Sequence, residues 1–191
     1  MQKKQGGRLS AKTTSKQTIN IFWGLTLREA IMASFFGTMV ALSKLIVRIP
    51  LKIPGHTGII WMALLTMCVL TYKKGRAGTL AGLIAGMLAV ILFLGKDGFL
   101  TFFKYFIPAG SLDLILSLFS VLRQKWYTTA LVSLVCFSLK ISIDILSGIL
   151  LRIPLGPLLF GLKLSFFNHM IFGFTGGAIG YFIYNRFIVK R

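Results

Sequence analysis

Ionisable and polar side chains stand inside the long apolar runs of this sequence, where a charge is costly and usually functional. Seven residues make up this set, with His56 at the entry to one run and the others within theirs: His56, Lys104, Asp113, Lys140, Asp144, Asn168 and His169. Amines, carboxylates, an amide and imidazoles bind polar solutes through hydrogen bonds and ion pairs. Their residue types therefore predict a binding site for a small molecule, provided that the fold brings them together.

The spacing within the set leaves two interpretations open. Lys140 and Asp144 are four residues apart, so on a helix they share a face and can neutralise each other in the core instead of meeting a solute. Asn168 and His169 are adjacent, so they point about 100° apart and need not face one pocket. His56 and His169 supply only two neutral metal ligands without a third, so we expect no metal site and no other cofactor.

Aromatic residues accompany the polar set. Trp61 follows His56, and a cluster of rings at 99–106 includes Phe103 and Phe106. These three side chains could stack on a ring-shaped ligand. The cluster fits an aromatic belt at the membrane surface equally well.

Motifs for catalysis are absent from the sequence. It contains no GxxxxGK[ST] loop, no HExxH and no GxSxG, and only four Asp and Glu residues in all. We therefore expect no enzyme and no catalytic residue. Any energised transport would need a separate ATPase, or ion coupling through Asp113 or Asp144.

The composition predicts a membrane protein. Of 191 residues, 55% are hydrophobic and only 14% are charged, with a mean hydropathy of +0.81. A soluble domain of this size could not bury that much apolar surface. The net charge of +18 does not indicate nucleic acid, because the basic residues cluster at the ends of apolar runs. That placement is typical of topology signals and of contact with anionic lipid.

Six apolar segments are long enough, or nearly so, to cross about 30 Å of hydrocarbon as helices. They cover residues 27–47, 57–72, 77–94, 99–122, 127–151 and 164–189. We predict an all-α bundle of six transmembrane helices as one domain over residues 21–191, after a basic cytoplasmic tail at 1–20. Residues 19–25 are apolar and could lie along the interface, and a long Pro-containing connection is expected at 152–163.

The distribution of basic residues predicts the orientation. With the N-terminus inside, fourteen Lys and Arg residues are cytoplasmic and six are external. This asymmetry places both termini inside a cell membrane. Most of the polar set then lies in the outer half of the membrane, open to the outside and closed below, as capture of an external solute requires.

Small residues recur at four-residue spacing in three segments, which makes flat stripes for close helix packing. The stripes of the third and sixth segments are expected to pack within the bundle. The first segment carries Ala33, Gly37 and Ala41, and this stripe could face a partner protein.

Three stretches of the sequence resemble the S component, the substrate-binding membrane subunit, of energy-coupling factor transporters. Residues 54–61 (PGHTGIIW) look like the loop and second-helix start of thiamine-precursor and related vitamin S components. Residues 74–80 (KGRAGTL), running on to 95–98 (GKDG), look like their basic turn, third helix and external turn. Residues 33–37 (ASFFG) resemble the contact for the scaffold subunit, with Gly in place of one Ala.

The resemblance implies binding of a vitamin or similar micronutrient on the outer side, with the long Pro-containing connection at 44–56, between the first two segments, as lid. It also implies a scaffold subunit and two ATPase subunits as partners, and no nucleic acid. Two other functions stay open: a structural or assembly membrane protein without a ligand, and a stand-alone ion-coupled carrier.

Overall fold

The computed structural model describes residues 20–22, 24–46, 57–72, 76–95, 97–150 and 155–189. Its described part is dominated by helices, which confirms the all-α prediction. The six helices are α1 (Leu27–Ile46), α2 (Gly58–Thr71), α3 (Ala77–Ile91), α4 (Leu100–Leu118), α5 (Trp126–Leu150) and α6 (Leu155–Tyr184). A 3-10 turn, η1 (Ser120–Arg123), precedes α5, and a π-helical turn, η2 (Asn185–Val189), follows α6.

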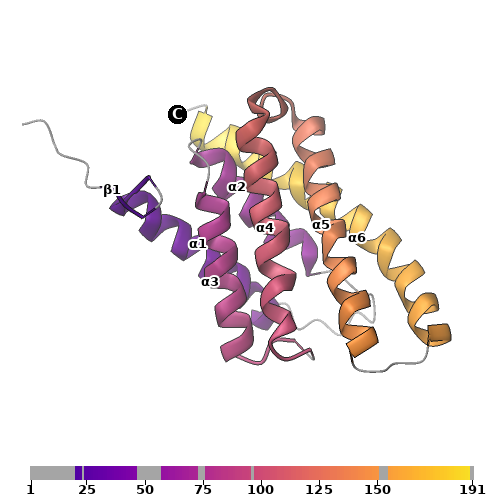
Figure 1. Cartoon of the computed structure of the whole chain (residues 1–191). Helices are drawn as coiled ribbons and strands as arrows, with labels where there is room; N and C mark the ends of the chain where they lie inside the picture. The colour runs from indigo at the N-terminus through magenta and orange to yellow at the C-terminus, as the bar shows by residue number, and fades with distance from the viewer. Residues whose placement is uncertain are drawn as a thin grey trace, which may run out of the picture.

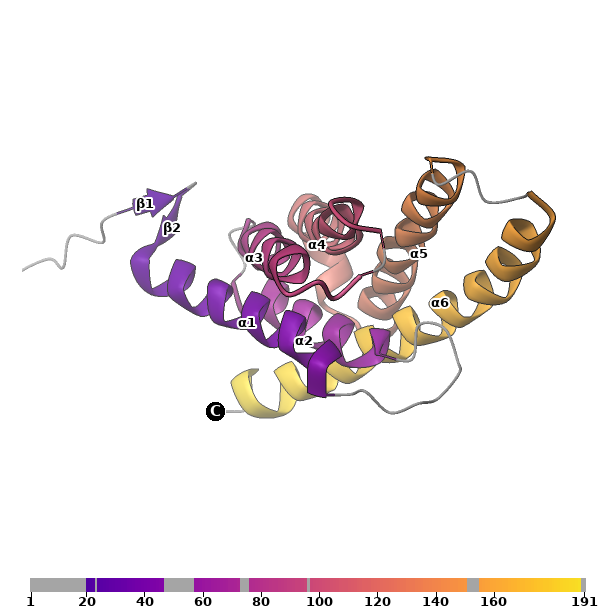
Figure 2. The same cartoon turned by 90° about the horizontal axis from the view of Figure 1, so that it is seen from below.

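The helices form two layers. Helices α3, α4 and α5 lie side by side in one layer, and α1, α2 and α6 form the other (Figures 1 and 2). One end of the bundle holds the end of α1, the start of α2 and the α3–α4 turn (Figure 1). We call it the cavity end. Helix α1 begins and α6 ends at the opposite end.

The outer surface of the bundle is apolar. On α5, Leu131, Val135 and Leu139 follow one another at four-residue spacing and are all exposed. Helices α1 and α5 are each long and apolar enough to cross a membrane, and α2 and α3 are shorter apolar helices. Exposed apolar helix faces around a partly polar interior are typical of proteins that are surrounded by lipid.

Glycine contacts hold α6 against two neighbours at once. A Cβ at Gly173 would lie 3.0 Å from the Cα of Leu134 on α5, and a Cβ at Gly176 would lie 2.8 Å from the carbonyl oxygen of Ile59 on α2. Because no side chain intervenes, the backbones approach closely. The prediction that the small residues of this helix pack within the bundle is confirmed.

The stripe on α1 also lies inside the bundle. Ala33 and Ala41 are fully buried, and a Cβ added at Gly37 would collide with the carbonyl oxygen of Ala81 on α3. The prediction that Ala33, Gly37 and Ala41 face a partner protein is therefore wrong, because α3 occupies that face.

Two boundaries differ from those expected. Residues Asn20–Phe22 (β1) and Leu25–Thr26 (β2) pair as a short antiparallel hairpin before α1. Helix α6 begins at Leu155, within the connection expected at 152–163. Pro157 permits this early start, because an N–H in the first helical turn has no intrahelical acceptor in any case.

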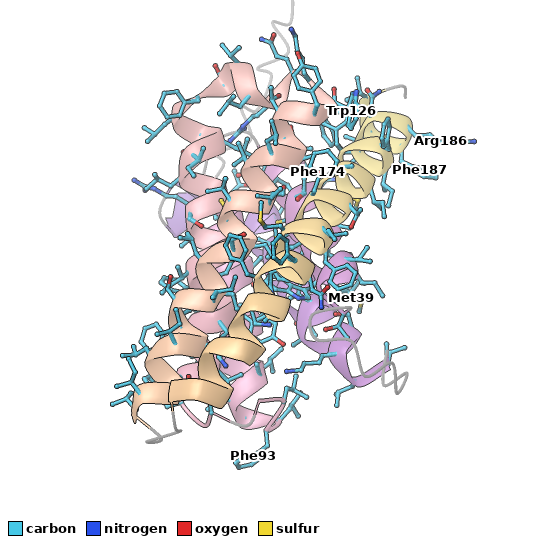
Figure 3. The ribbon with its side chains drawn as sticks, turned by 90° about the vertical axis from the view of Figure 1, so that its right-hand side faces the viewer. Met39, Phe93, Trp126, Phe174, Arg186 and Phe187 are labelled. Atoms are coloured by element: carbon cyan, nitrogen blue, oxygen red, sulfur yellow. The ribbon has the colours of Figure 1, made fainter. Side chains whose placement is uncertain are left out.

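Helix α3 ends in a Schellman motif that forms one edge of the cavity end. The N–H of Leu94 donates to Ala89 O at 2.9 Å, and that of Phe93 donates to Val90 O at 3.1 Å. Phe93 occupies the left-handed position of this motif with φ +50°, where glycine is the usual residue. Its side chain is 89% exposed and points away from the bundle (Figure 3), while Leu94 packs against the core.

Candidate functional site

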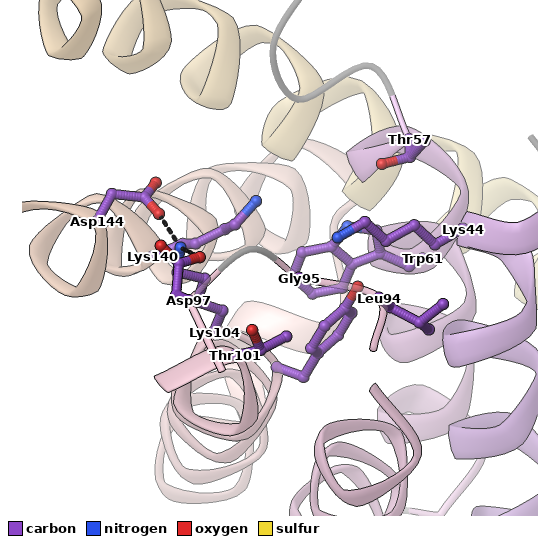
Figure 4. A pocket seen from close by; sticks show the side chains of 11 residues that line it. Lys44, Thr57, Trp61, Leu94, Gly95, Asp97, Thr101, Lys104, Lys140 and Asp144 are labelled. Atoms are coloured by element: carbon purple, nitrogen blue, oxygen red, sulfur yellow. Dashed lines mark hydrogen bonds and ion pairs between the residues drawn. The ribbon is translucent and has the colours of Figure 1, made fainter. Parts of the chain in front are cut away.

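A cavity of about 390 Å³ opens at the cavity end of the bundle. Its walls come from the end of α1, the start of α2, the α3–α4 turn, and α4 and α5 (Figure 4). The lining residues are Lys44, Thr57, Trp61, Leu94, Gly95, Asp97, Thr101, Lys104, Tyr105, Lys140 and Asp144. This volume lies near the lower end of the range for small-molecule sites, so the cavity fits a small solute.

A bridge of three charges forms one wall. The Lys104 ammonium pairs with Asp97 in the α3–α4 turn and, at 2.6 Å, with Asp144 Oδ1 on α5. All three side chains are largely shielded from solvent. Lys104 therefore joins the turn, α4 and α5 at the mouth of the cavity.

Two further lysines face the cavity without such a bridge. Lys44 comes from the last turn of α1 and Lys140 from α5. Among the described residues, neither has a carboxylate at ion-pair distance. Lys140 Nζ instead lies 5.8 Å from the ring centroid of Phe137, a cation–π contact. Of the two interpretations of Lys140 and Asp144, mutual neutralisation is not observed, because Lys104 on the neighbouring helix pairs with the carboxylate of Asp144.

Packed aromatic rings close the cavity below. Trp61 lies 5.5 Å from Tyr105 and 4.9 Å from Phe137 between ring centroids. On the far side, Phe137 stacks on His169 at 4.7 Å. Trp61, Tyr105 and Phe137 are buried, so this aromatic floor separates the cavity from the apolar interior.

The fold brings together four of the ten predicted substrate-binding residues. Trp61, Lys104, Lys140 and Asp144 all line the cavity. His56 lies outside the described residues. The other five, which do not line it, are Phe103, Phe106, Asp113, Asn168 and His169.

Asp113 holds a helix end. Its Oδ2 accepts hydrogen bonds from Thr79 N at 2.9 Å and Thr79 Oγ1 at 3.0 Å. Thr79 lies in the first turn of α3, where backbone N–H groups lack intrahelical acceptors and the helix dipole favours a negative charge. No residue of α3 supplies a side-chain cap there, so Asp113 caps α3 from α4. Asp113 thus does not line this cavity, and the contact that the structure gives it is with the start of α3.

His169 stands behind the aromatic floor. It is buried, and its Nδ1 lies 2.6 Å from Ser165 O in its own helix. The ring of Phe137 lies between it and Trp61, and His169 does not line the cavity. No group of three or more metal-ligating side chains occurs in the described part of the chain. Asn168, the preceding residue of α6, is half-buried and does not line the cavity.

Phe103 and Phe106 belong to a ladder of rings along α4 and not to the cavity. Phe102 lies 5.3 Å from each of them, at 85° to Phe103 and 19° to Phe106. Phe99, which is exposed, extends the ladder toward the cavity end. Phe103 and Phe106 therefore do not form a stacking wall of this cavity.

Sequence reasoning missed several lining residues. Lys44 and Asp97 stand at the ends of apolar runs, which is also where ordinary topology charges stand. Thr101 and Tyr105 look like unremarkable members of an aromatic segment. The one available signal was spacing, because 97, 101, 104 and 105 fall on one side of a helix that begins near residue 98.

Comparison of the chain with protein-family models, curated proteins and solved structures found no match. The class of protein therefore follows from fold and site alone. The described part of the chain is helical apart from the β1–β2 hairpin, two of its helices are long and apolar enough to cross a membrane, and a charged and aromatic cavity lies at one end.

Proposed function

We propose that this chain is the substrate-capture subunit of an energy-coupling factor importer in the cell membrane. In this proposal it spans the membrane with six helices, has both termini in the cytoplasm, and binds a vitamin-like micronutrient from outside. A scaffold subunit and two ATPase subunits are its partners, because the sequence has no nucleotide-binding loop of its own.

The observation that supports this function best is the cavity and its position. Under the orientation that the basic residues favour, the cavity end faces the outside. The cavity is lined by charges and by Trp61 and Tyr105, and packed rings close it below. A pocket that is open outward and closed inward suits capture of a solute better than conduction through a channel.

Purification from native membranes tests this proposal directly. Small molecules released by denaturing the protein would be identified by mass spectrometry and then tested for rebinding. We expect a defined heterocyclic compound at close to one per chain. If no compound is released, and none from a vitamin and metal panel binds, the proposal is wrong.

A matched pair of variants assigns the compound to the cavity. A Cβ at Gly95 would collide with the side chain of Thr101 in the cavity wall, whereas nothing lies within 4 Å of a Cβ at Gly110. Gly95→Leu should therefore lose the compound, and Gly110→Leu should keep it. Loss from both variants, or from neither, would place the compound elsewhere.

One observation favours a ligand-free structural protein as the second candidate. Lys104, Asp97 and Asp144 already satisfy one another, as charges that only stabilise a bundle would. Joint replacement of Lys44 and Lys140 by methionine separates the two functions, because both line the cavity but neither belongs to this bridge. A structural protein should tolerate it, whereas a capture subunit should lose its ligand.

A further inference from the structure

We propose that the solute bound in this cavity carries a carboxylate or phosphate group, and that the group lies between the ammonium groups of Lys44 and Lys140. This inference rests on the proposed capture function and names the chemical class of the ligand. It depends on three features of the cavity: its charges, the direction of its lysines, and a hydroxyl without a partner.

The charges of the described lining favour an anion. Three lysines and two aspartates line the cavity, so one positive charge is in excess. Both aspartates engage Lys104, so a cationic ligand would have to compete with that ammonium for them. Lys44 and Lys140 have no carboxylate at ion-pair distance among the described residues, so an anion would bind them without displacing a partner.

The two lysines are placed on opposite walls. Figure 4 shows their ammonium ends pointing toward each other across the cavity, one from α1 and the other from α5. Two like charges that face each other away from bulk water repel, and an anion between them turns this repulsion into two attractions. Charge-assisted hydrogen bonds from ammonium to carboxylate or phosphate oxygen are among the strong ones.

Thr101 adds a neutral donor to the same cavity. Its side chain lines the wall and is 2% exposed, and its Oγ1 has no hydrogen-bond partner within the described structure. A buried hydroxyl without a partner is costly, so a ligand oxygen would satisfy it. Trp61 and Tyr105 line the same cavity, so an acid attached to a flat ring would have aromatic side chains to contact.

The experiment identifies the compound that co-purifies with the protein and tests which lysines are needed to bind it. Wild-type protein from native membranes is denatured, and the released compounds are identified in positive and negative ion modes. The same is done for Lys44→Met, Lys140→Met and the charge-retaining Lys140→Arg. Lys125→Met is the matched control, since Lys125 is exposed at the opposite end of the bundle. Melting temperatures of all variants show which of them are folded.

We expect a compound with a carboxylate or phosphate group. Its affinity should fall about ten- to hundredfold in Lys44→Met and in Lys140→Met. Lys140→Arg and Lys125→Met should retain the compound. If a methionine variant fails to fold, the arginine variant still tests whether a positive charge at position 140 is sufficient for binding.

Four results would overturn the inference, the last of them together with the capture function. A released compound without an acid group would do so while leaving the capture function intact, and so would an acid that folded Lys44→Met and Lys140→Met retain fully. If a phospholipid were the sole bound compound, Lys44 and Lys140 would bind a lipid headgroup and not a captured solute. Release of no compound from wild-type protein would overturn the capture function itself.

Discussion

The cap that Asp113 provides for α3 makes a quantitative prediction. Asp113 is 1% exposed, and its Oδ2 accepts two hydrogen bonds from Thr79 at 2.9 and 3.0 Å. Hydrogen bonds to a charged group contribute about 1.5–3 kcal/mol each, but these two share one acceptor oxygen and do not add fully. We therefore expect Asp113→Ala to lower the free energy of unfolding by about 3 kcal/mol, and Asp113→Asn by about 1 kcal/mol.

Thermal unfolding in detergent measures this loss. For a chain of this size, about 1 kcal/mol corresponds to roughly 2–4 °C, so Asp113→Ala should lower the melting temperature by about 6–12 °C. Cys68 and Cys136 are free and fully buried, so a thiol-reactive fluorogenic dye reports unfolding. Cys68 Sγ lies 3.8 Å from Ala77 O in the first turn of α3. In a Cys136→Ala background, Cys68 should therefore react early in the Asp113→Ala protein.

Two controls bracket the result. Ser117→Ala on α4 removes a hydroxyl that bonds only within its own helix, to Leu114 O, and should leave the melting temperature unchanged. Thr79→Val removes one of the two donors and should account for about 1 kcal/mol of the effect. If Asp113→Ala melted at or above the wild-type temperature, the desolvation cost of the carboxylate would exceed its capping contribution, and the reasoning would be refuted.

Three further substitutions test other parts of the fold, each through the same melting measurement. Lys104→Met leaves Asp97 and Asp144 without their cation; because both are partly solvated, we expect a loss of about 2 kcal/mol, below the value for fully buried pairs. Gly37→Leu should cost about 3 kcal/mol, because α1 must move away from α3. Phe93→Gly should raise stability by about 1 kcal/mol, because it relieves the left-handed backbone of an exposed residue.

Each of these has its own control. Converting both aspartates to asparagine should restore much of the stability that Lys104→Met loses, and failure to do so would show that the bridge is not the cause. Gly110→Leu, in open space, should cost far less than Gly37→Leu. A fall in melting temperature on Phe93→Gly would mean that the exposed ring contributes more than its backbone strain costs.

The sequence predicts the helices closely, and the reason is visible in particular residues. Runs of apolar residues bounded by Gly, Lys and Arg place α1, α2 and α5 within a few residues of their observed ends. The start of α6 is the exception. Pro157 in the sequence indicates a loop, but proline is tolerated in a first helical turn, so the helix begins earlier, at Leu155.

The site was predicted only in part, because sequence assigns a residue to a helix but not to a neighbour. Lys104, Lys140 and Asp144 were identified as costly charges, and the cavity contains them all. The pairing of Lys104 with Asp144 across two helices, and the cap that Asp113 provides for Thr79, join residues far apart in the chain. No local pattern encodes these contacts.

The sequence by itself determined that the chain is helical and apolar enough for lipid, and where its helices lie. It also determined which charged side chains stand in apolar segments, where burial of a charge has a high free-energy cost. Only the tertiary structure decided which faces turn inward. Lipid and protein interior are both apolar, so hydrophobicity does not distinguish a buried face from a lipid-facing one. That is why the small-residue face of α1 could be predicted as a partner surface when α3 in fact covers it.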